Sequence, residues 1–427
     1  MNFVGCLLPI SGLIYLQHHL FNFSLWSLLD RELNRDKWGL SLFAGIFLYN
    51  KAFNFGLINY IIGIGFAISA FWIWIRYREK IIGIWIVLFT VLGGSVCLMH
   101  FYAFVIYGVG VIGYECSVFW ETRTIKRQVR MSLFRIPLRA ALSLLVPLLA
   151  VIWFSPVSSS HGPTVWVPPW DSFWHWKATG LASPILYSFH ASEKPLLLVM
   201  LVIFVVALAT RIMVVNSRMV IPLAAFGVIF MVSPWMLLGA AGTDDRLPSG
   251  MAFFALASIG WGNTSRVRIE VVRLLLAVCL IVRVGSIISH WQPAQAIIGE
   301  YDTALQLVPP GSRLLVIVDD SWNWVDRIPP LIHVPVLAAA KQGVFVPYTF
   351  TDDGVLVGGI QLLKLRPDYR DFWRPTPDPS NINDIKRFDY LLEIQKPQVK
   401  IPTGVLLNEV GSGRTFDLYR VEQDALK

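Results

Sequence analysis

The stretch "IIGIWIVLFTVLGGSVCLMHFYAFVIYGVGVIGYECSVFW" covers residues 81–120 and contains a single Asp, Glu, Lys or Arg side chain, Glu115. A helix needs about 20 apolar residues to cross the roughly 30 Å hydrocarbon core of a membrane. This run is therefore too long for one helix, and its most polar point is "CLMHFY" around His100. We expect two membrane-spanning helices that form a hairpin with its turn at His100.

The chain as a whole has the composition of an integral membrane protein. Of its 427 residues, 55% are hydrophobic and 15% are charged, and the mean hydropathy is positive. Such a composition excludes a soluble globular protein. We predict an α-helical polytopic membrane protein with about ten transmembrane helices. The predicted spans cover approximately residues 3–21, 38–51, 55–75, 81–98, 102–119, 136–155, 195–213, 219–240, 248–264 and 270–290.

Positive residues cluster at every second connection between these spans. Because cytoplasmic loops of membrane proteins carry an excess of Lys and Arg, we expect all the clusters to be cytoplasmic. The other connections are then external: "YNKAFNFG" at 49–56, the His100 turn, the loop of about 156–194, "GTDDRLPSG" at 242–250 and the whole tail after His290. The clusters are Arg31, Arg35 and Lys37; Arg76, Arg78 and Lys80; Arg123, Lys126, Arg127, Arg130, Arg135 and Arg139; Arg211 and Arg218; and Arg266, Arg268 and Arg273.

The same alternation places the N-terminus outside. The first residues, "MNFVGCLLPISGLIYLQHHL", lack the basic region and the cleavage site of a signal peptide, so they predict a retained membrane segment. An external N-terminus without a signal sequence predicts at least one further helix upstream of Met1.

Charge and cysteine content exclude two further interpretations. Residues 1–290 hold 22 Lys and Arg against 11 Asp and Glu, whereas residues 291–427 hold 14 against 17. The basic excess lies in short loops between apolar runs, so membrane orientation explains it and nucleic-acid binding does not. The four cysteines, Cys6, Cys97, Cys116 and Cys279, all lie in apolar runs, so the polar tail holds no disulfide framework.

Residues 291–427 form a second, extracytoplasmic domain that is long enough to bury its own core. "PAQAIIGEYDTALQLVPPGS" at 293–312 predicts a helix that ends at a Pro-Pro-Gly turn, and "RLLVIVDD" at 313–320 predicts a buried strand. A helix at 336–342 and strands at 343–350, 387–394 and 415–421 follow. This alternation predicts a small α/β sandwich or sheet.

The external loop of about 156–194 concentrates aromatic and polar side chains. They are Trp166, Trp170, Asp171, Trp174, His175, Trp176 and Lys177. Indole rings pack on the C–H faces of sugars while carboxylates hold the hydroxyls, which favours a carbohydrate-handling site. The other interpretation is an interfacial belt on an amphipathic helix, because residues 170, 174 and 177 share one helical face. Both interpretations remain open at this stage.

Two further places carry candidate chemistry. The first is a tight external loop that contains Asp244, Asp245 and Arg246. An arginine there can hold a lipid-linked phosphate bidentately, and a carboxylate can act as base. The alternative interpretation is a solvated loop without a ligand. Arg283 lies inside the last span, roughly 12 Å from its outer end, and either extends outward or meets a phosphate. We expect Glu115 to be solvated about one turn from the cytoplasmic end of its span.

Motifs of soluble enzymes are missing from the chain. It has no phosphate loop, dinucleotide fingerprint, HExxH or GxSxG motif, and no Cys/His cluster with metal-binding spacing. The stretch "LYNKAFNFGLINYIIGIG" at 48–65 combines asparagines with small residues, which allow close packing of helices in a membrane.

The order of these features resembles bacterial multi-spanning proteins of the GT-C superfamily of glycosyltransferases. The resemblance rests on "YNKAFNFGLINY" at 49–60, the hairpin at His100, the alternating spans and the outward tail with "VPPGSRLLVI" at 308–317. It implies transfer of a sugar from a polyprenyl-phosphate donor to an envelope glycan or lipid at the external face of the bacterial inner membrane. It also implies a catalytic acid in the first external loop, which is sometimes a ligand of a divalent metal.

The chain departs from that family at this acid. Its first internal connection, 22–37, is cytoplasmic by the charge rule, so Asp30, Glu32 and Asp36 lie on the wrong side. Either the acid precedes Met1, or Asp171, Asp244 or Asp245 has taken its role.

Three hypotheses follow. The first is a membrane glycosyltransferase-like protein whose partners are a lipid-linked sugar donor, membrane lipids and envelope-assembly proteins. The second is a non-catalytic scaffold or subunit of envelope polysaccharide assembly. The third is a transporter, which the scarcity of charges within the spans disfavours. The candidate catalytic residues are Asp171, Asp244 and Asp245, and the candidate substrate-binding residues are Trp166, Trp170, Trp174, His175, Trp176, Arg246 and Arg283.

Overall fold

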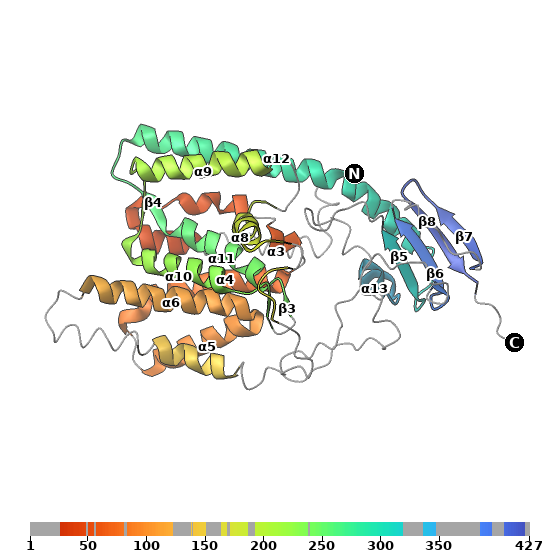
Figure 1. The fold of residues 1–427 in the computed structure, drawn as a ribbon, viewed down its shortest axis with the longest axis horizontal. Helices are drawn as coiled ribbons and strands as arrows, with labels where there is room; N and C mark the ends of the chain where they lie inside the picture. The colour runs from red at the N-terminus through yellow and green to blue at the C-terminus, as the bar shows by residue number, and fades with distance from the viewer. Residues whose placement is uncertain are drawn as a thin grey trace. The chain divides into compact units, whose positions relative to one another are not determined.

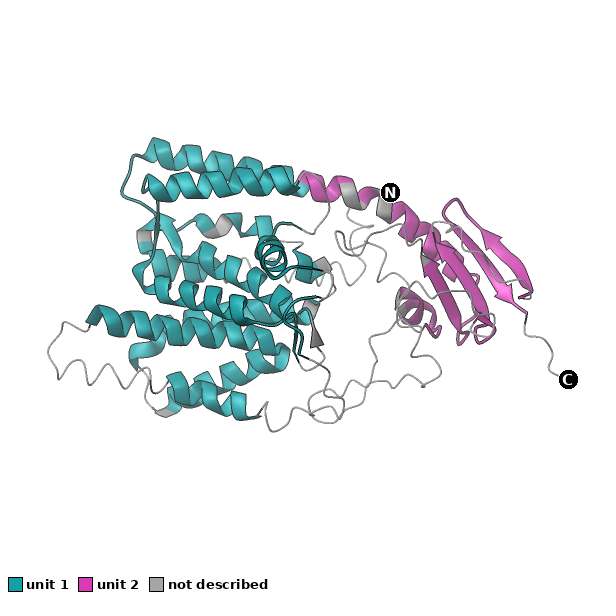
Figure 2. Cartoon of the chain, in the orientation of Figure 1, with its two compact units in different colours: residues 1–284 teal, residues 285–427 magenta. Residues whose placement is uncertain are grey.

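The computed structural model divides the chain into two compact units, residues 1–284 and 285–427 (Figure 2). The boundary falls within one long helix, α12 (Arg266–Leu305). The structure describes residues 26–47, 50–54, 57–80, 83–122, 138, 140–150, 164–168, 171–186, 193–237, 240–318, 336–346, 385–394 and 405–422.

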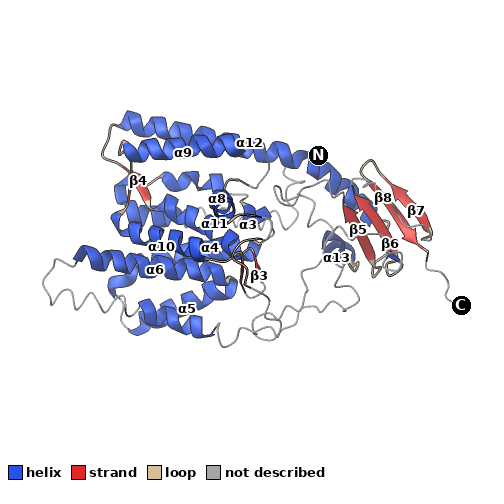
Figure 3. Cartoon of the chain, in the orientation of Figure 1, coloured by secondary structure: helices blue, strands red, loops and turns tan. Residues whose placement is uncertain are grey.

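Unit 1 is mainly helical, and short strands connect some of its helices (Figures 1 and 3). Its first described helix covers residues 26–34. The helices that follow are η1 (Arg35–Lys37), η2 (Leu40–Phe47), α3 (Lys51–Asn54), α4 (Ile58–Tyr77), η3 (Arg78–Lys80), α5 (Gly83–Met99), α6 (Phe101–Glu121), Ala140–Ala150, α8 (Phe173–Ala182), α9 (Glu193–Ala209), η5 (Ser217–Met219), α10 (Val220–Val232), α11 (Thr243–Ala257) and the first part of α12.

Some of these helices meet the requirements of a membrane span. Among the described residues, three are long and apolar enough to cross a membrane: Asn59–Lys80, Phe101–Glu121 and Arg266–Ser289. Ile84–Met99, Ala140–Ala150 and Ser217–Val232 are apolar but shorter. The first predicted span, 3–21, lies outside the described residues, and the second, 38–51, contains the 3-10 helix η2.

Two helices meet at His100 as predicted, although, within the described residues, only the second, Phe101–Glu121, is long and apolar enough to cross a membrane. Helix α5 ends at Met99 and α6 begins at Phe101, while His100 between them has extended backbone angles. Its ring Nδ1 accepts a hydrogen bond from the backbone N–H of Tyr102 at 3.2 Å. The side chain therefore satisfies one of the amide groups that the first turn of α6 leaves free.

Small residues let the helices of unit 1 approach closely. A Cβ on Gly63 of α4 would lie 2.8 Å from the Cβ of Ala103, and one on Gly113 of α6 would lie 2.8 Å from the Cα of Pro222 in α10. A residue larger than glycine therefore does not fit at either contact, as expected of helices that pack in a membrane. Large aromatic side chains, among them Phe71, Trp74 and Phe254, fill the core between these helices.

Contacts at the helix ends define two ends of unit 1. At the first, which we call the His100 end, Tyr60 at the start of α4 packs on His100 and bonds to Arg246 near the start of α11. The strands β2 (Met236–Leu237) and β3 (Ala240–Ala241), between α10 and α11, pair there. At the opposite end, the Arg78 end, Arg78 after α4 bonds to Glu115 near the end of α6. The strands β1 (Met213–Val215) and β4 (Ile259–Trp261) pair in an antiparallel register after α9 and α11.

Unit 2 is an α/β unit built on a four-stranded sheet with the order β5-β6-β8-β7. Its strands are β5 (Leu314–Val318), β6 (Tyr390–Ile394), β7 (Leu407–Ser412) and β8 (Phe416–Val421), and α13 (Val336–Gln342) adds a short helix. Strands β5 and β6 are parallel, and the other neighbours are antiparallel. The last turns of α12 contribute Tyr301, Ala304 and Leu305 to the same core as the strands.

The structure corrects several expectations. The last span and the helix predicted from 293 are one continuous helix, α12. "GTDDRLPSG" is not a loop, because α11 begins at Thr243 and includes Pro248. Strand β7 was not predicted, and the strand predicted at 343–350 appears among the described residues as a bridge between Arg313 and Phe345.

Glu115 is buried, contrary to the expectation that it is solvated. Its carboxylate accepts hydrogen bonds from the Nε and Nη2 of Arg78 at 2.7 and 2.6 Å and from the Nε1 of Trp74 at 2.8 Å. These donors compensate the charge that burial would otherwise leave without solvation.

Candidate site at the His100 end of unit 1

The first turn of α11 forms the centre of the candidate site. Gly242, just before the helix, has φ +67°, a left-handed conformation that favours glycine. The Thr243 hydroxyl donates to the Pro234 carbonyl, and the Thr243 N–H donates to the Trp235 carbonyl at 3.0 Å. These bonds attach α11 to the segment after α10, and they place Asp244 and Asp245 in the first turn, where the helix dipole favours negative charge.

Asp244 forms a buried ion pair with Lys177 of α8. The Lys177 Nζ lies 2.6 Å from the Asp244 Oδ2, and the two side chains are 2% and 1% exposed. The same Nζ donates to the Ser233 carbonyl at 2.6 Å and lies 4.9 Å from the centre of the Phe230 ring. Both charges are therefore held in an enclosed place by several partners.

Asp245 forms a second ion pair, with Lys51 of α3. The Lys51 Nζ lies 2.8 Å from the Asp245 Oδ2, and the side chains are 9% and 15% exposed. This pair joins residues that are 194 positions apart in the sequence. It is more accessible than the pair of Asp244 and Lys177.

Trp176 of α8 connects the two ion pairs. Its indole Nε1 donates to the Asp244 Oδ2 at 2.9 Å, and the Lys51 Nζ lies 5.0 Å from the centre of its ring. The ring also meets Trp235 edge to face, with centroids 6.4 Å apart. One indole thus contacts the carboxylate of the first pair and the ammonium of the second.

Arg246 brings a third cation to this end of the unit. Its guanidinium carbon lies 5.3 Å from the centre of the Tyr102 ring, and its backbone carbonyl accepts a hydrogen bond from Tyr60. Burial, with a smaller contribution from the Arg246 charge, lowers the pKa of the nearby His100 to about 4. The imidazole is therefore neutral at pH 7, and because its Nδ1 accepts from Tyr102, its proton is on Nε2.

Three polar atoms of the first turn of α11 are buried without a hydrogen-bond partner among the described residues. They are the Oδ1 of Asp244, the Oδ1 of Asp245 and the Nε of Arg246. Burial raises the pKa of Asp244, an effect that the bond from Lys177 opposes. Buried polar atoms without partners are uncommon because each costs about 1–3 kcal/mol, so a ligand with hydroxyl donors and an anionic acceptor would complement this turn.

The other residues predicted from the loop of about 156–194 precede α8 or lie on its exposed face, and the Trp166 carbonyl accepts a hydrogen bond from the Trp235 N–H at 3.2 Å. Asp171 accepts from the Nδ1 of His175 at 2.8 Å, and Ser172 caps the helix by accepting from the His175 N–H. Trp174 is 73% exposed, and Trp166 is 56% exposed. The described part of α8 therefore presents Trp174 and His175 outward and directs Lys177 inward, so residues 174 and 177 do not form one exposed belt. Trp170 lies outside the described residues.

Arg283 is engaged elsewhere in unit 1. Its Nη1 donates to the Oε1 of Glu193, the first residue of α9, at 2.5 Å, and the two side chains are 1% and 4% exposed. The expectation that it extends outward is wrong, because a buried carboxylate compensates its charge in place.

The carboxylates at this end do not suit a divalent metal. A lysine ammonium already occupies one oxygen of Asp244 and one of Asp245. Within the described part of the chain, no three His, Cys, Asp or Glu side chains gather as a metal ion would require.

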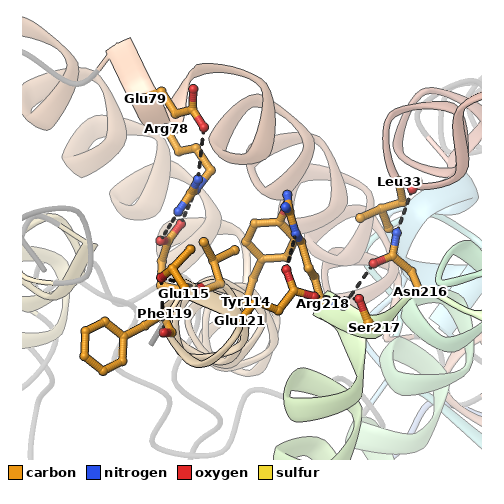
Figure 4. A network of polar contacts seen from close by, with 12 residues as sticks. Leu33, Arg78, Glu79, Tyr114, Glu115, Phe119, Glu121, Asn216, Ser217 and Arg218 are labelled. Atoms are coloured by element: carbon orange, nitrogen blue, oxygen red, sulfur yellow. Dashed lines mark hydrogen bonds and ion pairs between the residues drawn. The ribbon is translucent and has the colours of Figure 1, made fainter. Parts of the chain in front are cut away.

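A second polar network lies at the Arg78 end, and Figure 4 shows it at close range. Besides the pair of Arg78 and Glu115, Arg218 donates to Glu121 at 3.0 Å, and Ser217 donates to the same carboxylate at 2.6 Å. These contacts join α6 to η5, and their donors and acceptors satisfy one another. The network therefore has the character of a structural connection.

Sequence reasoning did not single out Lys51, and it named Lys177 in the loop of about 156–194 without predicting its carboxylate partner. Lys51 and Lys177 both lie in connections that the charge rule predicts to be external, where cations are less frequent. A cation in such a place signals a local acidic partner, and this signal could have identified both pairs.

Comparison with models of protein families gives no match for this chain, and comparison with curated proteins and with solved structures gives none either.

Proposed function

We propose that unit 1 is a membrane-embedded, GT-C-like glycosyltransferase that binds the head group of a polyprenyl-phosphate sugar at the His100 end. The observation that carries the proposal is the first turn of α11. Two carboxylate oxygens and one guanidinium nitrogen are buried there without partners among the described residues. A glycosyl phosphate offers hydroxyl donors to carboxylates and an anionic oxygen to a guanidinium.

The surrounding residues fit the same class of ligand. Trp176 and Tyr102 supply aromatic faces beside the charged groups, as carbohydrate sites do. Lys51 and Lys177 balance the negative charges of Asp245 and Asp244. Arg246 therefore leaves a net positive charge among these five residues, which favours a phosphate. Because His100 stays neutral, its Nε2–H can donate to an oxygen of the leaving phosphate without repelling Arg246.

The proposal includes an orientation in the membrane. About ten spans, an external His100 end and an extracytoplasmic unit 2 in a bacterial inner membrane agree with the charge distribution. Cysteine labelling in intact cells tests this, in a variant that lacks the native cysteines. Trp174→Cys, at the His100 end, should react with a membrane-impermeant maleimide, and Ser265→Cys should react only after lysis.

The reaction would be a displacement at the anomeric carbon. An acceptor hydroxyl forms the new C–O bond while its proton passes to a carboxylate; the bond from the anomeric carbon to the phosphate oxygen breaks, and the electron pair leaves with the lipid phosphate. General-base assistance of this kind contributes about 10²–10⁴-fold to rate.

Turnover by the full chain in lipid vesicles tests the proposal. The vesicles carry polyprenyl-phosphate-linked hexoses and an alkyl glycoside acceptor, and release of polyprenyl phosphate is measured. We expect turnover by the wild type, loss in a variant with both Asp244→Asn and Asp245→Asn, and retention in Glu121→Gln, a matched carboxylate at the Arg78 end. Equal turnover in all three would contradict the proposal.

A second candidate function is that of a non-catalytic scaffold. It is favoured by the observation that Asp244 and Asp245 each have a lysine partner, because such pairs can serve to hold α3 and α8 on α11. A scaffold predicts no turnover of any donor, and it predicts that only variants that unfold the protein lose function in the cell.

A further inference from the structure

The two carboxylates of α11 differ in their surroundings, which suggests that they have different roles. This inference rests on the proposed function, and it assigns the roles within that site. We infer that Asp245 is the catalytic residue that receives the proton of the acceptor hydroxyl, and that Asp244 is a positioning residue that holds α8 against α11.

Asp244 is fixed through its Oδ2 by two buried donors, although its Oδ1, like that of Asp245, has no hydrogen-bond partner among the described residues. Lys177 and Trp176 both donate to its Oδ2, and the Lys177 ammonium is itself fixed by the Ser233 carbonyl and the Phe230 ring. With exposed fractions of 1% and 2%, neither member of the pair can leave without exposing a buried charge. Such a pair is suited to holding two helices together.

Asp245 is held less tightly. Its side chain as a whole is 15% exposed, against 1% for Asp244, although the Asp245 Oδ1 itself is buried; Lys51, its partner at 2.8 Å, is carried by the four-residue helix α3. The Asp245 Oδ1 has no hydrogen-bond partner among the described residues, so an arriving hydroxyl would satisfy an atom that is costly to leave unpaired. The Oδ2 can stay bound to Lys51 while Oδ1 takes the proton.

Gly180 of α8 leaves the space beside this oxygen. A Cβ at position 180 would lie 3.9 Å from the Asp245 Oδ1 and 3.3 Å from the Cζ of Phe230. A methyl group there would lie between the Phe230 ring and the Asp245 oxygen, and it would press more closely on Phe230. Gly180 is thus a position at which added volume should hinder the acceptor beside the Asp245 Oδ1.

In the transfer step, the acceptor oxygen bonds to the anomeric carbon as its proton moves to the Asp245 Oδ1. The glycosidic C–O bond breaks, and both of its electrons leave with the lipid phosphate. Lys51 then stabilises the second oxygen of the protonated carboxyl by its hydrogen bond. Asp244 takes no proton in this step.

Carboxyl modification of the full chain in detergent tests the assignment without requiring activity. A water-soluble carbodiimide with glycine ethyl ester should modify Asp245, and intact-peptide mass spectrometry should find Asp244 modified at least about tenfold more slowly. An alkyl glycoside should protect Asp245. Modification of Asp244 at the same rate as Asp245 would overturn the inference.

Variants test the same assignment through stability and turnover. We expect Asp244→Asn to lower the unfolding midpoint by several degrees and the double variant with Lys177→Met to recover most of the loss, because the double variant leaves no unpaired charge. Asp245→Asn should lower the midpoint less than Asp244→Asn does, because Lys51 is 9% exposed against 2% for Lys177, and it should lose roughly 100-fold or more in turnover.

Glycine variants complete the design. Gly180→Ala should raise the KM for the acceptor several-fold with a smaller effect on kcat. Gly227→Ala is the matched control, because a Cβ at that position in α10 meets nothing within 4 Å. If the wild type turns over donor and Asp245→Asn does so equally well, the inference fails while the proposed function stands. If no donor is turned over, the proposed function fails. The labelling and stability results then still decide which carboxylate is the accessible one.

Discussion

Arg283 of α12 and Glu193 at the start of α9 form a buried ion pair with 2.5 Å between Nη1 and Oε1. Both helices also present apolar side chains such as Leu198, Val202 and Ile281 outward. Removing one member leaves the other charged and buried, which typically costs about 3–5 kcal/mol.

We therefore predict that Arg283→Met strongly destabilises unit 1 and that adding Glu193→Gln restores much of the stability. Unfolding of the full chain in mixed detergent micelles measures both. The control is Arg218→Gln, which breaks an ion pair whose side chains are 47% and 36% exposed and should cost less than about 1 kcal/mol. A double variant as unstable as Arg283→Met would count against a role of the pair itself.

The contact between α6 and α10 gives a second prediction. A Cβ on Gly113 would lie 2.8 Å from the Cα of Pro222, a backbone atom that a rotamer change cannot move. Gly113→Ala should therefore cost about 1–3 kcal/mol through displacement of α10. Gly94→Ala is the control: its Cβ would meet nothing within 4 Å, and helix propensity then favours alanine by up to about 1 kcal/mol. Equal effects of the two variants on the unfolding free energy would contradict this account.

Local sequence patterns predicted the helices of unit 1 well. Apolar length and a single polar residue sufficed to predict the α5–α6 hairpin at His100, because the thickness of a membrane limits how long each helix can be. The same reasoning failed at "GTDDRLPSG". Gly, Asp, Pro and Ser are typical of turns, yet Asp is equally favourable in the first turn of a helix, and Pro248 is accommodated within α11.

The partners of the charged residues could not be predicted in the same way. Lys177 and Asp244 are 67 positions apart, and Arg283 and Glu193 are 90 apart, so their pairing depends on how the helices pack. From the sequence, Glu115 was expected to be solvated and Arg283 to extend outward or meet a phosphate, whereas each has a buried partner on another helix or connection. Asp244, Asp245 and Arg246 were therefore predicted as a group, whereas Lys51 was missed and Lys177 was named without its partner.

Unit 2 offers a prediction about pH. Burial, with the Asp417 carboxylate opposite it in the sheet, raises the pKa of Glu393 to about 7. Because the folded-state pKa lies above the unfolded value of 4.5, the stability linked to this group is fully present below about pH 4.5 and is lost as pH rises through 7. We expect unit 2 to lose about 2 kcal/mol between pH 5 and pH 8.

Urea-dependent proteolysis of unit 2 in the full chain at pH 5, 6, 7 and 8 measures this loss. Glu393→Gln should remove most of the pH dependence, since a glutamine has no proton to lose. Glu409→Gln, on the edge strand β7, is the control and should leave the pH dependence in place. A flat stability profile for the wild type over this range would show that Glu393 titrates normally.

The two tryptophans on opposite sides of α8 give the last prediction. The Trp176 indole N–H donates to Asp244, and the Lys51 ammonium lies over the Trp176 ring, whereas Trp174 is 73% exposed. Trp176→Phe keeps an aromatic face for Lys51 and removes the N–H donor, so we expect a loss of about 1.5–3 kcal/mol, the usual value for a hydrogen bond to a charged group. Trp174→Phe should change the unfolding free energy by less than about 0.5 kcal/mol. If both variants were equally stable, Lys177 alone would suffice to hold the Asp244 carboxylate, and the indole of Trp176 would be available to contact a ligand. If only Trp176→Phe is destabilised, the indole belongs to the framework that holds the two carboxylates in place.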